Sequence, residues 1–142
     1  MERTEKELYN ELFKLANAAR AASYCPYSGF SVGAALLTRG GKIYTGVNIE
    51  NSSFTPTVCA ERVAFFKAVS DGEREFAAIA IAGGKFGCEP NESTPPCGVC
   101  RQVMGEFAGA DLKIILSGGD TPLVYTLGEL LPMSFDKASL GK

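Results

Sequence analysis

Two short stretches, each bearing cysteine, hold the side chains in this sequence that are best suited to chemistry. The first is Thr57-Val58-Cys59-Ala60-Glu61-Arg62, and the second is Pro96-Cys97-Gly98-Val99-Cys100-Arg101. Each stretch follows a loop that contains proline and threonine and leads into a helical pattern. Together they offer three thiols and one carboxylate. This set suits a catalytic zinc ion with three protein ligands, an open fourth position and a proton shuttle beside it.

The Cys97–Cys100 pair alone does not decide between several sites. A C-x-x-C pair also occurs in structural zinc sites and in thioredoxin-like redox sites. A structural zinc site needs four ligands, and the sequence has no histidine to complete one. The redox interpretation is weakened because residues 83–96, rich in Gly, Pro, Asn and Ser, lead into the pair where thioredoxin has a strand. A catalytic zinc site and a structural-zinc binding module remain the two alternatives.

Cys59 alone would more often be a buried core thiol, but Glu61 two positions later favours a site. A helix N-terminus carries roughly half a positive charge, which lowers thiol pKa values and favours thiolate ligands. If both helices present their N-termini to one point, the three thiols leave the fourth zinc position open. The lack of histidine also excludes Ser-His and Cys-His nucleophilic catalysis. Acid–base chemistry must then come from a carboxylate, a perturbed Lys or Tyr, or a metal-bound water.

Composition excludes several classes of function. The 142 residues are 46% hydrophobic and 21% charged, with a net charge of −2, so no basic face is expected for duplex nucleic acid or an anionic membrane. No apolar run approaches the roughly 20 residues of a transmembrane helix, and the N-terminus lacks a signal-peptide core. We therefore expect one domain over residues 1–142 in the cytoplasm, where clustered cysteines favour metal binding over disulfides.

Hydrophobic periodicity predicts the element order α-β-β-α-β-α-β-β-α. A capping box of Thr4 and Glu7 opens the first helix. The predicted helices cover about residues 5–22, 59–69, 98–107 and 127–131, and the predicted strands cover 30–38, 42–49, 77–82, 113–116 and 123–126. Residues 83–96 are expected to form a surface loop, and the last residues a tail. This order predicts an α/β fold with a mixed five-stranded sheet between helix layers, a three-layer α/β/α domain.

Four motifs in a fixed order are similar to those of a known family. They are PYSGFSVGAA at residues 26–35, GVNIEN at 46–51, CAER at 59–62 and PCGVCRQ at 96–102. Over nearly its whole length the sequence resembles the small homotetrameric cytidine deaminases. Zinc deaminases use His/Cys/Cys or three-Cys zinc with a glutamate that is not a ligand, and a chain without histidine matches the three-Cys form.

The resemblance implies a role for each candidate residue. Cys59, Cys97 and Cys100 would hold one Zn²⁺ per subunit, and Glu61 would shuttle protons. Asn48 and Glu50, two apart at a strand end and so on one side of it, would bind the ribose hydroxyls, although a solvent-facing strand edge is the alternative. Phe30 would stack near the pyrimidine ring, and the Ala60 backbone N–H would bind the ring O2. Arg62, with Gln102 nearby, would compensate the charge of the thiolates. Phe135 would enter a neighbouring subunit's site, or alternatively pack on its own domain.

The implied function is hydrolytic deamination of cytidine and 2′-deoxycytidine to uridine and 2′-deoxyuridine plus ammonia, in pyrimidine salvage. Zinc would hold a water, Glu61 would take its proton, and the hydroxide would attack C4 of the ring. The expected partner is a small nucleoside, with sites shared between subunits of a homotetramer and no nucleic acid or membrane. The alternatives are another deaminase substrate, such as a nucleoside antibiotic, a nucleotide or cytosine in RNA, and the structural-zinc module.

Three features depart from the family pattern or have no role. Phe54 stands where the family is expected to have tyrosine, so a hydroxyl is missing from the loop before the first ligand. The 83–96 loop is long for the family. Cys25 and Cys88 have no assigned role and are interpreted as structural or incidental.

Overall fold

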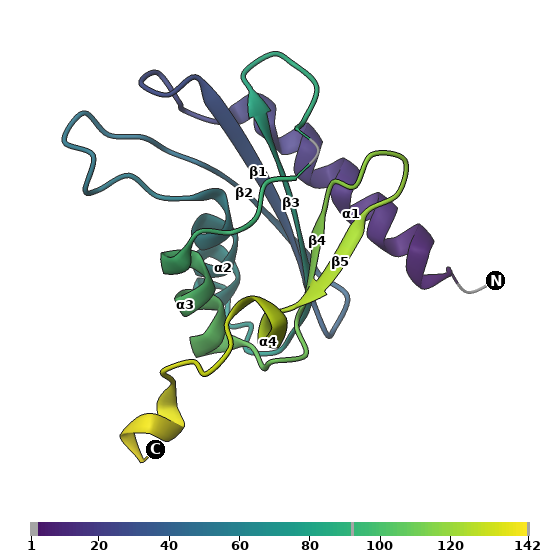
Figure 1. Ribbon diagram of the computed structural model, residues 1–142, viewed down its shortest axis with the longest axis vertical. Coiled ribbons are helices and arrows are strands. Elements are labelled where there is room, and N and C mark those ends of the chain that lie inside the picture. The colour runs from purple at the N-terminus through teal and green to yellow at the C-terminus, as the bar shows by residue number, and fades with distance from the viewer. Residues whose placement is uncertain (1–2, 92, 142) are drawn as a thin grey trace.

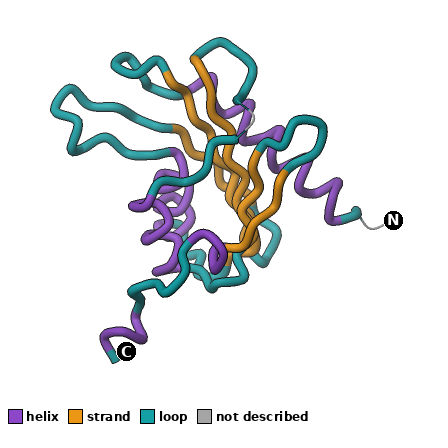
Figure 2. The backbone as a smooth tube through the Cα atoms, in the orientation of Figure 1, coloured by secondary structure: helices purple, strands orange, loops and turns teal. Residues whose placement is uncertain are grey.

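The computed structural model describes residues 3–91 and 93–141 and shows one five-stranded sheet between helices (Figures 1 and 2). The strands are β1 (Phe30–Thr38), β2 (Ile43–Val47), β3 (Phe76–Lys85), β4 (Lys113–Leu116) and β5 (Leu123–Thr126). The helices are α1 (Glu5–Ala19), α2 (Ala60–Ser70), α3 (Gly98–Phe107) and α4 (Leu127–Leu130), with 3-10 turns at Arg20–Ala22 and Lys137–Leu140.

The sheet is mixed, with strand order β2-β1-β3-β4-β5. β1 pairs antiparallel with β2 and β3, β3 pairs parallel with β4, and β4 pairs antiparallel with β5. A parallel pair needs a crossover connection, and α3 lies in the chain between β3 and β4. These pairings confirm the mixed five-stranded sheet that the sequence predicts.

Helices cover both faces of the sheet (Figure 1). On one face, Leu12 and Ala16 of α1 pack in a cluster with Ala35, Ala80 and Ile115 of the sheet. On the other face, α2, α3 and α4 pack in a larger cluster. Because β1 and β3 are covered on both sides, their residues are apolar and buried almost without alternation. The three-layer α/β/α fold class is confirmed.

Several element boundaries differ from the predicted ones. The capping box at Thr4 is present, but α1 gives way after Ala19 to a 3-10 turn where the chain turns towards β1. β2 ends at Val47, two residues earlier than predicted, and the segment predicted as a tail contains a 3-10 turn at Lys137–Leu140. Among residues 3–91 and 93–141, no helix is both long and apolar enough to cross a membrane.

β3 extends to Lys85, so the prediction of a loop from residue 83 is wrong at its start. Gly83 and Gly84 lie within the strand and pair with Val32 and Ser31 of β1. A Cβ atom on Gly83 would lie 2.7 Å from the Thr94 side chain, and one on Gly84 would lie 2.9 Å from the Glu89 carbonyl oxygen. The two glycines therefore allow the following loop to fold back over the strand, and they do not end it.

Candidate functional site

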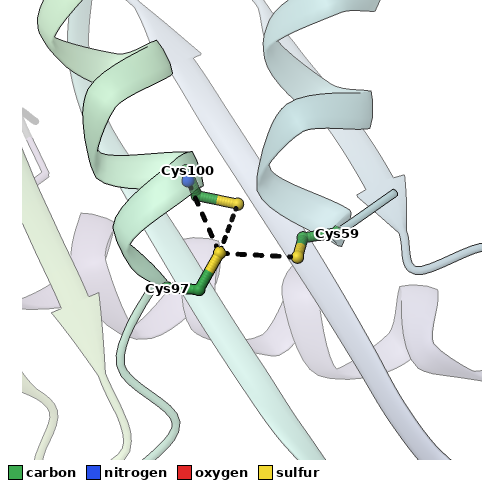
Figure 3. A group of neighbouring side chains, drawn as sticks. All are labelled: Cys59, Cys97 and Cys100. Atoms are coloured by element: carbon green, nitrogen blue, oxygen red, sulfur yellow. Dashed lines mark hydrogen bonds between the residues drawn. The ribbon is translucent and has the colours of Figure 1, made fainter. Parts of the chain in front are cut away.

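The three candidate cysteines lie at the N-termini of two neighbouring helices (Figure 3). Cys59 is the N-cap residue of α2, and Cys97 is the N-cap residue of α3. Cys100 lies in the first turn of α3, where its backbone N–H donates to Cys97 Sγ over 3.5 Å. Both helices therefore direct the positive ends of their dipoles at one cluster of sulfur atoms, which favours the thiolate form.

The spacing of the sulfur atoms fits one zinc ion. Cys59 Sγ lies 3.7 Å from Cys97 Sγ, and Cys97 Sγ lies 3.5 Å from Cys100 Sγ. All three are free thiols, and their sulfur atoms lie within 4.8 Å of one another. A tetrahedral zinc about 2.3 Å from each sulfur holds its ligand atoms roughly 3.8 Å apart. In residues 3–91 and 93–141 this is the one such cluster of metal-ligating side chains, and it supplies three ligands.

The thiols perturb one another strongly. A hydrogen bond from Cys100 is the largest cause that lowers the pKa of Cys59, to about 5, and it outweighs the opposing effect of burial. The same hydrogen bond, together with burial, raises the pKa of Cys100. Arg62 contributes to the low Cys59 pKa, because its Nη2 lies 3.6 Å from Cys59 Sγ. The positively charged guanidinium of Arg62 therefore lies beside the cysteine cluster.

Glu61 is a buried carboxyl group beside the sulfur atoms. It lies in the first turn of α2 with only 4% of its surface exposed. Burial raises its pKa to about 7, and the charge of Cys59 adds to the effect. A carboxyl group with a pKa near neutrality can both accept and return a proton, which is what a shuttle between water and substrate requires.

Asn48 and Glu50 both direct their side chains at the segment that enters β1. Asn48 Nδ2 donates to the Phe30 carbonyl oxygen over 2.8 Å, and its Oδ1 accepts from Val32 N over 2.9 Å. Glu50 accepts hydrogen bonds from the backbone and hydroxyl of Ser28 and from the backbone of the residue before it. They lie just past the end of β2, joined to neighbouring segments by single bridges at residue 49.

A hollow of about 380 Å³ adjoins Glu50. It is lined by Tyr27, Ser28, Glu50, Phe54 and Thr57. Phe54 is exposed and meets Tyr27 edge to face, with ring centroids 6.2 Å apart. The loop phenylalanine that the sequence singles out is therefore part of the wall of this hollow.

Phe30 is the first residue of β1, and Ala60 is at the start of α2. The Phe30 ring lies against Gly83, since a Cβ atom there would be 3.0 Å from Phe30 Cε2. Ala60 is the first residue of α2 and is completely buried, so its backbone N–H belongs to the unpaired first turn of the helix. The Ala60 N–H, next to Cys59 in the chain, is therefore available to a ring bound beside the cysteine cluster.

Gln102 and Phe135 contact each other. Gln102 Nε2 donates to the Phe135 carbonyl oxygen over 2.8 Å, so the side-chain amide binds the C-terminal segment and not the cysteines. The Phe135 side chain is 62% exposed, which disfavours the alternative in which it packs on its own domain. Gln102 therefore fixes the segment that presents Phe135 to the surroundings.

Comparison with known proteins agrees with this geometry. Residues 6–116 match the family described as the cytidine and deoxycytidylate deaminase zinc-binding region, and this range includes both cysteine stretches. The chain belongs to this family.

The chain is also similar over most of its length to individual cytidine deaminases. It is 46% identical over 132 residues to a cytidine deaminase of Sporosarcina psychrophila, with 92% of this chain and 93% of the relative covered. It is 48% identical over 126 residues to one of Halalkalibacterium halodurans, covering 87% and 91%. A crystal structure of cytidine deaminase from Burkholderia pseudomallei superposes with a TM-score of 0.81 at 43% identity, covering 94% of this chain and all of that one.

Three polar residues of this deaminase-family chain had no role in the sequence analysis. Ser28 bridges Glu50 and Phe30, and its position before Gly29 in a turn motif is the one signal that indicated a local hydrogen bond. Arg20 is 6% exposed and donates to backbone oxygens of β1, of the last residue of β3 and of the loop after it. Arg101 donates to the carbonyl oxygens of Pro96 and Leu130 and so holds the loop before Cys97. Nothing in the sequence distinguishes either arginine from a solvated helix residue.

Proposed function

We propose that this chain is a zinc-dependent cytidine deaminase whose residues 1–142 form one catalytic domain. It converts cytidine and 2′-deoxycytidine to uridine and 2′-deoxyuridine with release of ammonia, as in pyrimidine salvage. The observation that carries the proposal is the convergence of three free thiols and one buried carboxyl group at two helix N-termini. The relatives named above support the choice of substrate.

Cys59, Cys97 and Cys100 would hold the zinc ion, one per subunit. When bound, the ion supplies the Lewis acidity that makes water a nucleophile at neutral pH. Three ligands leave room for a fourth, which distinguishes a catalytic site from a closed structural one. Arg62 beside Cys59 offsets the negative charge that three thiolates bring.

Glu61 moves the protons of the reaction. It takes one proton from the attacking water and delivers it to N3 of the pyrimidine. It then carries the second proton of that water to the amino group on C4, so that ammonia leaves and the water oxygen stays on C4 as the new carbonyl oxygen. Its buried position beside Cys59 and Cys100 supports this role. The Ala60 backbone N–H binds O2 of the ring.

The sugar binds beside the segment that leads into β1, where Glu50 and Asn48 lie. Glu50 and Asn48 accept hydrogen bonds from the ribose hydroxyls, and Phe30 contacts the pyrimidine. A net charge of −2 and an anionic Glu50 favour a free nucleoside over a polynucleotide. Hydrogen bonding to Ser28 is the largest cause of the lowered Glu50 pKa, which keeps the carboxylate ionised as an acceptor.

We also propose that the protein acts as a homotetramer in the cytoplasm, with Phe135 entering the site of a neighbouring subunit. Phe135 and Met133, two residues apart in the chain, are both exposed, and this supports the assembly because exposed apolar side chains that occur together mark protein–protein contact sites. A reducing cytoplasm would keep the three zinc-binding thiols from pairing as disulfides.

One assay tests the function. Incubation with cytidine should lower the absorbance at the cytidine band as uridine forms, and removal of zinc with a chelator should abolish this turnover. Glu61→Gln should keep the fold and the zinc but lower kcat by at least about 10³-fold, because the amide cannot accept the proton of water. Full zinc content with no turnover of cytidine or deoxycytidine by the unaltered protein would refute the proposal and favour the structural-zinc module. Turnover of a nucleoside antibiotic alone would leave the chemistry and change the substrate.

A further inference from the structure

We propose that Ser28 is a positioning residue that orients Glu50 for the sugar, through a hydroxyl whose own direction is fixed by the backbone of Phe30. This inference rests on the proposed function, in which Glu50 accepts a hydrogen bond from a sugar hydroxyl. It is carried by the hydrogen bonds around one exposed serine in the turn that enters β1.

Ser28 contacts both oxygens of the Glu50 carboxylate. Its backbone N–H donates to Oε1 over 3.1 Å, and its hydroxyl donates to Oε2 over 2.5 Å. The Tyr27 backbone N–H also donates to Oε1, over 3.0 Å. A carboxylate has about four lone-pair positions, two on each oxygen. Since Oε1 already accepts two hydrogen bonds and Oε2 one, the one position left for a ligand belongs to Oε2.

The direction of the Ser28 hydroxyl is fixed by its second partner. Phe30 N lies 3.0 Å from Ser28 Oγ, and a backbone N–H can only donate. The hydroxyl therefore accepts from Phe30 and gives its own proton to Glu50. One hydroxyl group thus connects the backbone of the residue that contacts the pyrimidine with the carboxylate that contacts the sugar.

This arrangement determines what Glu50 can recognise. An ionised carboxylate with a single open position on Oε2 accepts one hydroxyl and donates to none. Ser28 and Glu50 both line the hollow of about 380 Å³ described above, which leaves room for a ligand beside the carboxylate. Without the Ser28 hydroxyl, Oε2 loses its fixed partner and the carboxylate is held only through Oε1. The sugar hydroxyl would then meet a less ordered acceptor.

The test compares a substrate that has sugar hydroxyls with one that lacks them. Ser28→Ala should raise KM for cytidine on the order of 10-fold, with kcat within about twofold of the unaltered enzyme. KM for 2′,3′-dideoxycytidine should not change, because that nucleoside has no ring hydroxyl at the 2′ or 3′ position to donate. Ser28→Thr keeps a hydroxyl and should restore most of the affinity for cytidine.

Ser53→Ala is the matched control. Ser53 is also an exposed loop serine, but its hydroxyl donates to Asn51 Oδ1 over 3.1 Å, and the variant should leave both KM values unchanged. Thermal unfolding of each variant shows that it is folded, and Ser28→Cys, with a weak thiol donor, replaces the alanine variant if that one unfolds.

Two results would overturn the role of Ser28. One is an unchanged KM for cytidine in a folded Ser28→Ala enzyme. The other is an equal rise in KM for both substrates, since the serine would then act on the pyrimidine and not through Glu50. The unaltered enzyme in the same assay separates this inference from the proposed function. If it deaminates cytidine while Ser28→Ala matches it, only the Ser28 inference fails; if it deaminates nothing, the function fails first.

Discussion

Arg62 places a positive charge beside the cysteine cluster. Three thiolates on Zn²⁺ leave one net negative charge, which works against acidification of a bound water. Arg62 follows Glu61 directly on α2, and its Nη2 approaches Cys59 Sγ. Its Nε is buried and has no acceptor among the described residues, while its charge is stabilised by Cys59 and Cys100.

Removal of Arg62 should therefore reduce activity more than zinc binding. We expect Arg62→Ala to retain part of the zinc and to lose about 10–100-fold in kcat/KM, the range typical of groups that support metal ligands. Zinc content and turnover on the same preparation give the two readouts. Arg74→Ala is the control, because Arg74 donates only to backbone carbonyls near the end of α2. Unchanged turnover in Arg62→Ala would show that the cluster needs no compensating cation.

At the residue scale, the spacing of the motifs predicts that the three cysteines lie close together, and in the structure they do. The cysteines and Glu61 were predicted from types and intervals in the sequence, and the structure brings them together. The bond from Gln102 to Phe135 could not be predicted in this way, because it joins α3 to the C-terminal segment across the fold. The hydrogen bond from Ser28 to Glu50 could not be predicted for a similar reason, since the two residues are far apart along the chain.

At the element scale, the position of α2 is set by a close approach to β2. Gly46 of β2 lies under the first turn of α2, where a Cβ atom would be 2.4 Å from the Ala60 carbonyl oxygen and 2.6 Å from Ala64 N. These are backbone atoms, so the helix itself would have to move. Ala60 lies between Cys59 and Glu61, so a shift of this turn would displace both a proposed zinc ligand and the proposed proton shuttle.

Gly46→Ala should accordingly disturb the site as well as the fold. Gly33→Ala is a matched control on the neighbouring strand, because its Cβ would lie 2.0 Å from the Ala16 carbonyl oxygen of α1, a helix without ligands. Both variants should lose about 1–3 kcal/mol of stability from overpacking. Only Gly46→Ala should also lose zinc and turnover per folded molecule. Measured by thermal unfolding, metal content and activity, equal effects of the two variants on zinc would contradict a specific role for Gly46.

Glycine also explains which element boundaries could be predicted. β1, β4, β5 and α3 have the predicted bounds because turn and loop residues flank them in the sequence. β3 was predicted too short because a pair of glycines normally ends a strand. In the fold, Gly83 and Gly84 make room for Phe30, Thr94 and the loop that follows. Contacts of this kind depend on segments far apart in sequence, and local propensity does not contain them.

At the scale of the whole molecule, the C-terminal segment extends away from the three layers (Figure 1). It carries Met133, Phe135 and Leu140, all strongly exposed. Two interactions attach it to α3, the hydrogen bond from Gln102 and an ion pair between Lys137 and Glu106 with 3.7 Å between Nζ and Oε2. An anchored segment with an apolar exposed surface is suited to contact a second copy of the chain, as in the proposed homotetramer.

Sharing of sites between subunits can be tested by complementation. Phe135→Ala should assemble but turn over cytidine poorly, because every site lacks the aromatic from its neighbour, while Glu61→Gln should be inactive with Phe135 intact. Co-expressed in equal amounts, the two chains should regain activity, since about a quarter of randomly assembled sites combine Glu61 from one chain with Phe135 from the other. Size-exclusion chromatography would confirm assembly, and the doubly substituted chain is the control that cannot be rescued. A mixture no more active than the sum of its parts would place Phe135 in its own subunit's site or outside any site.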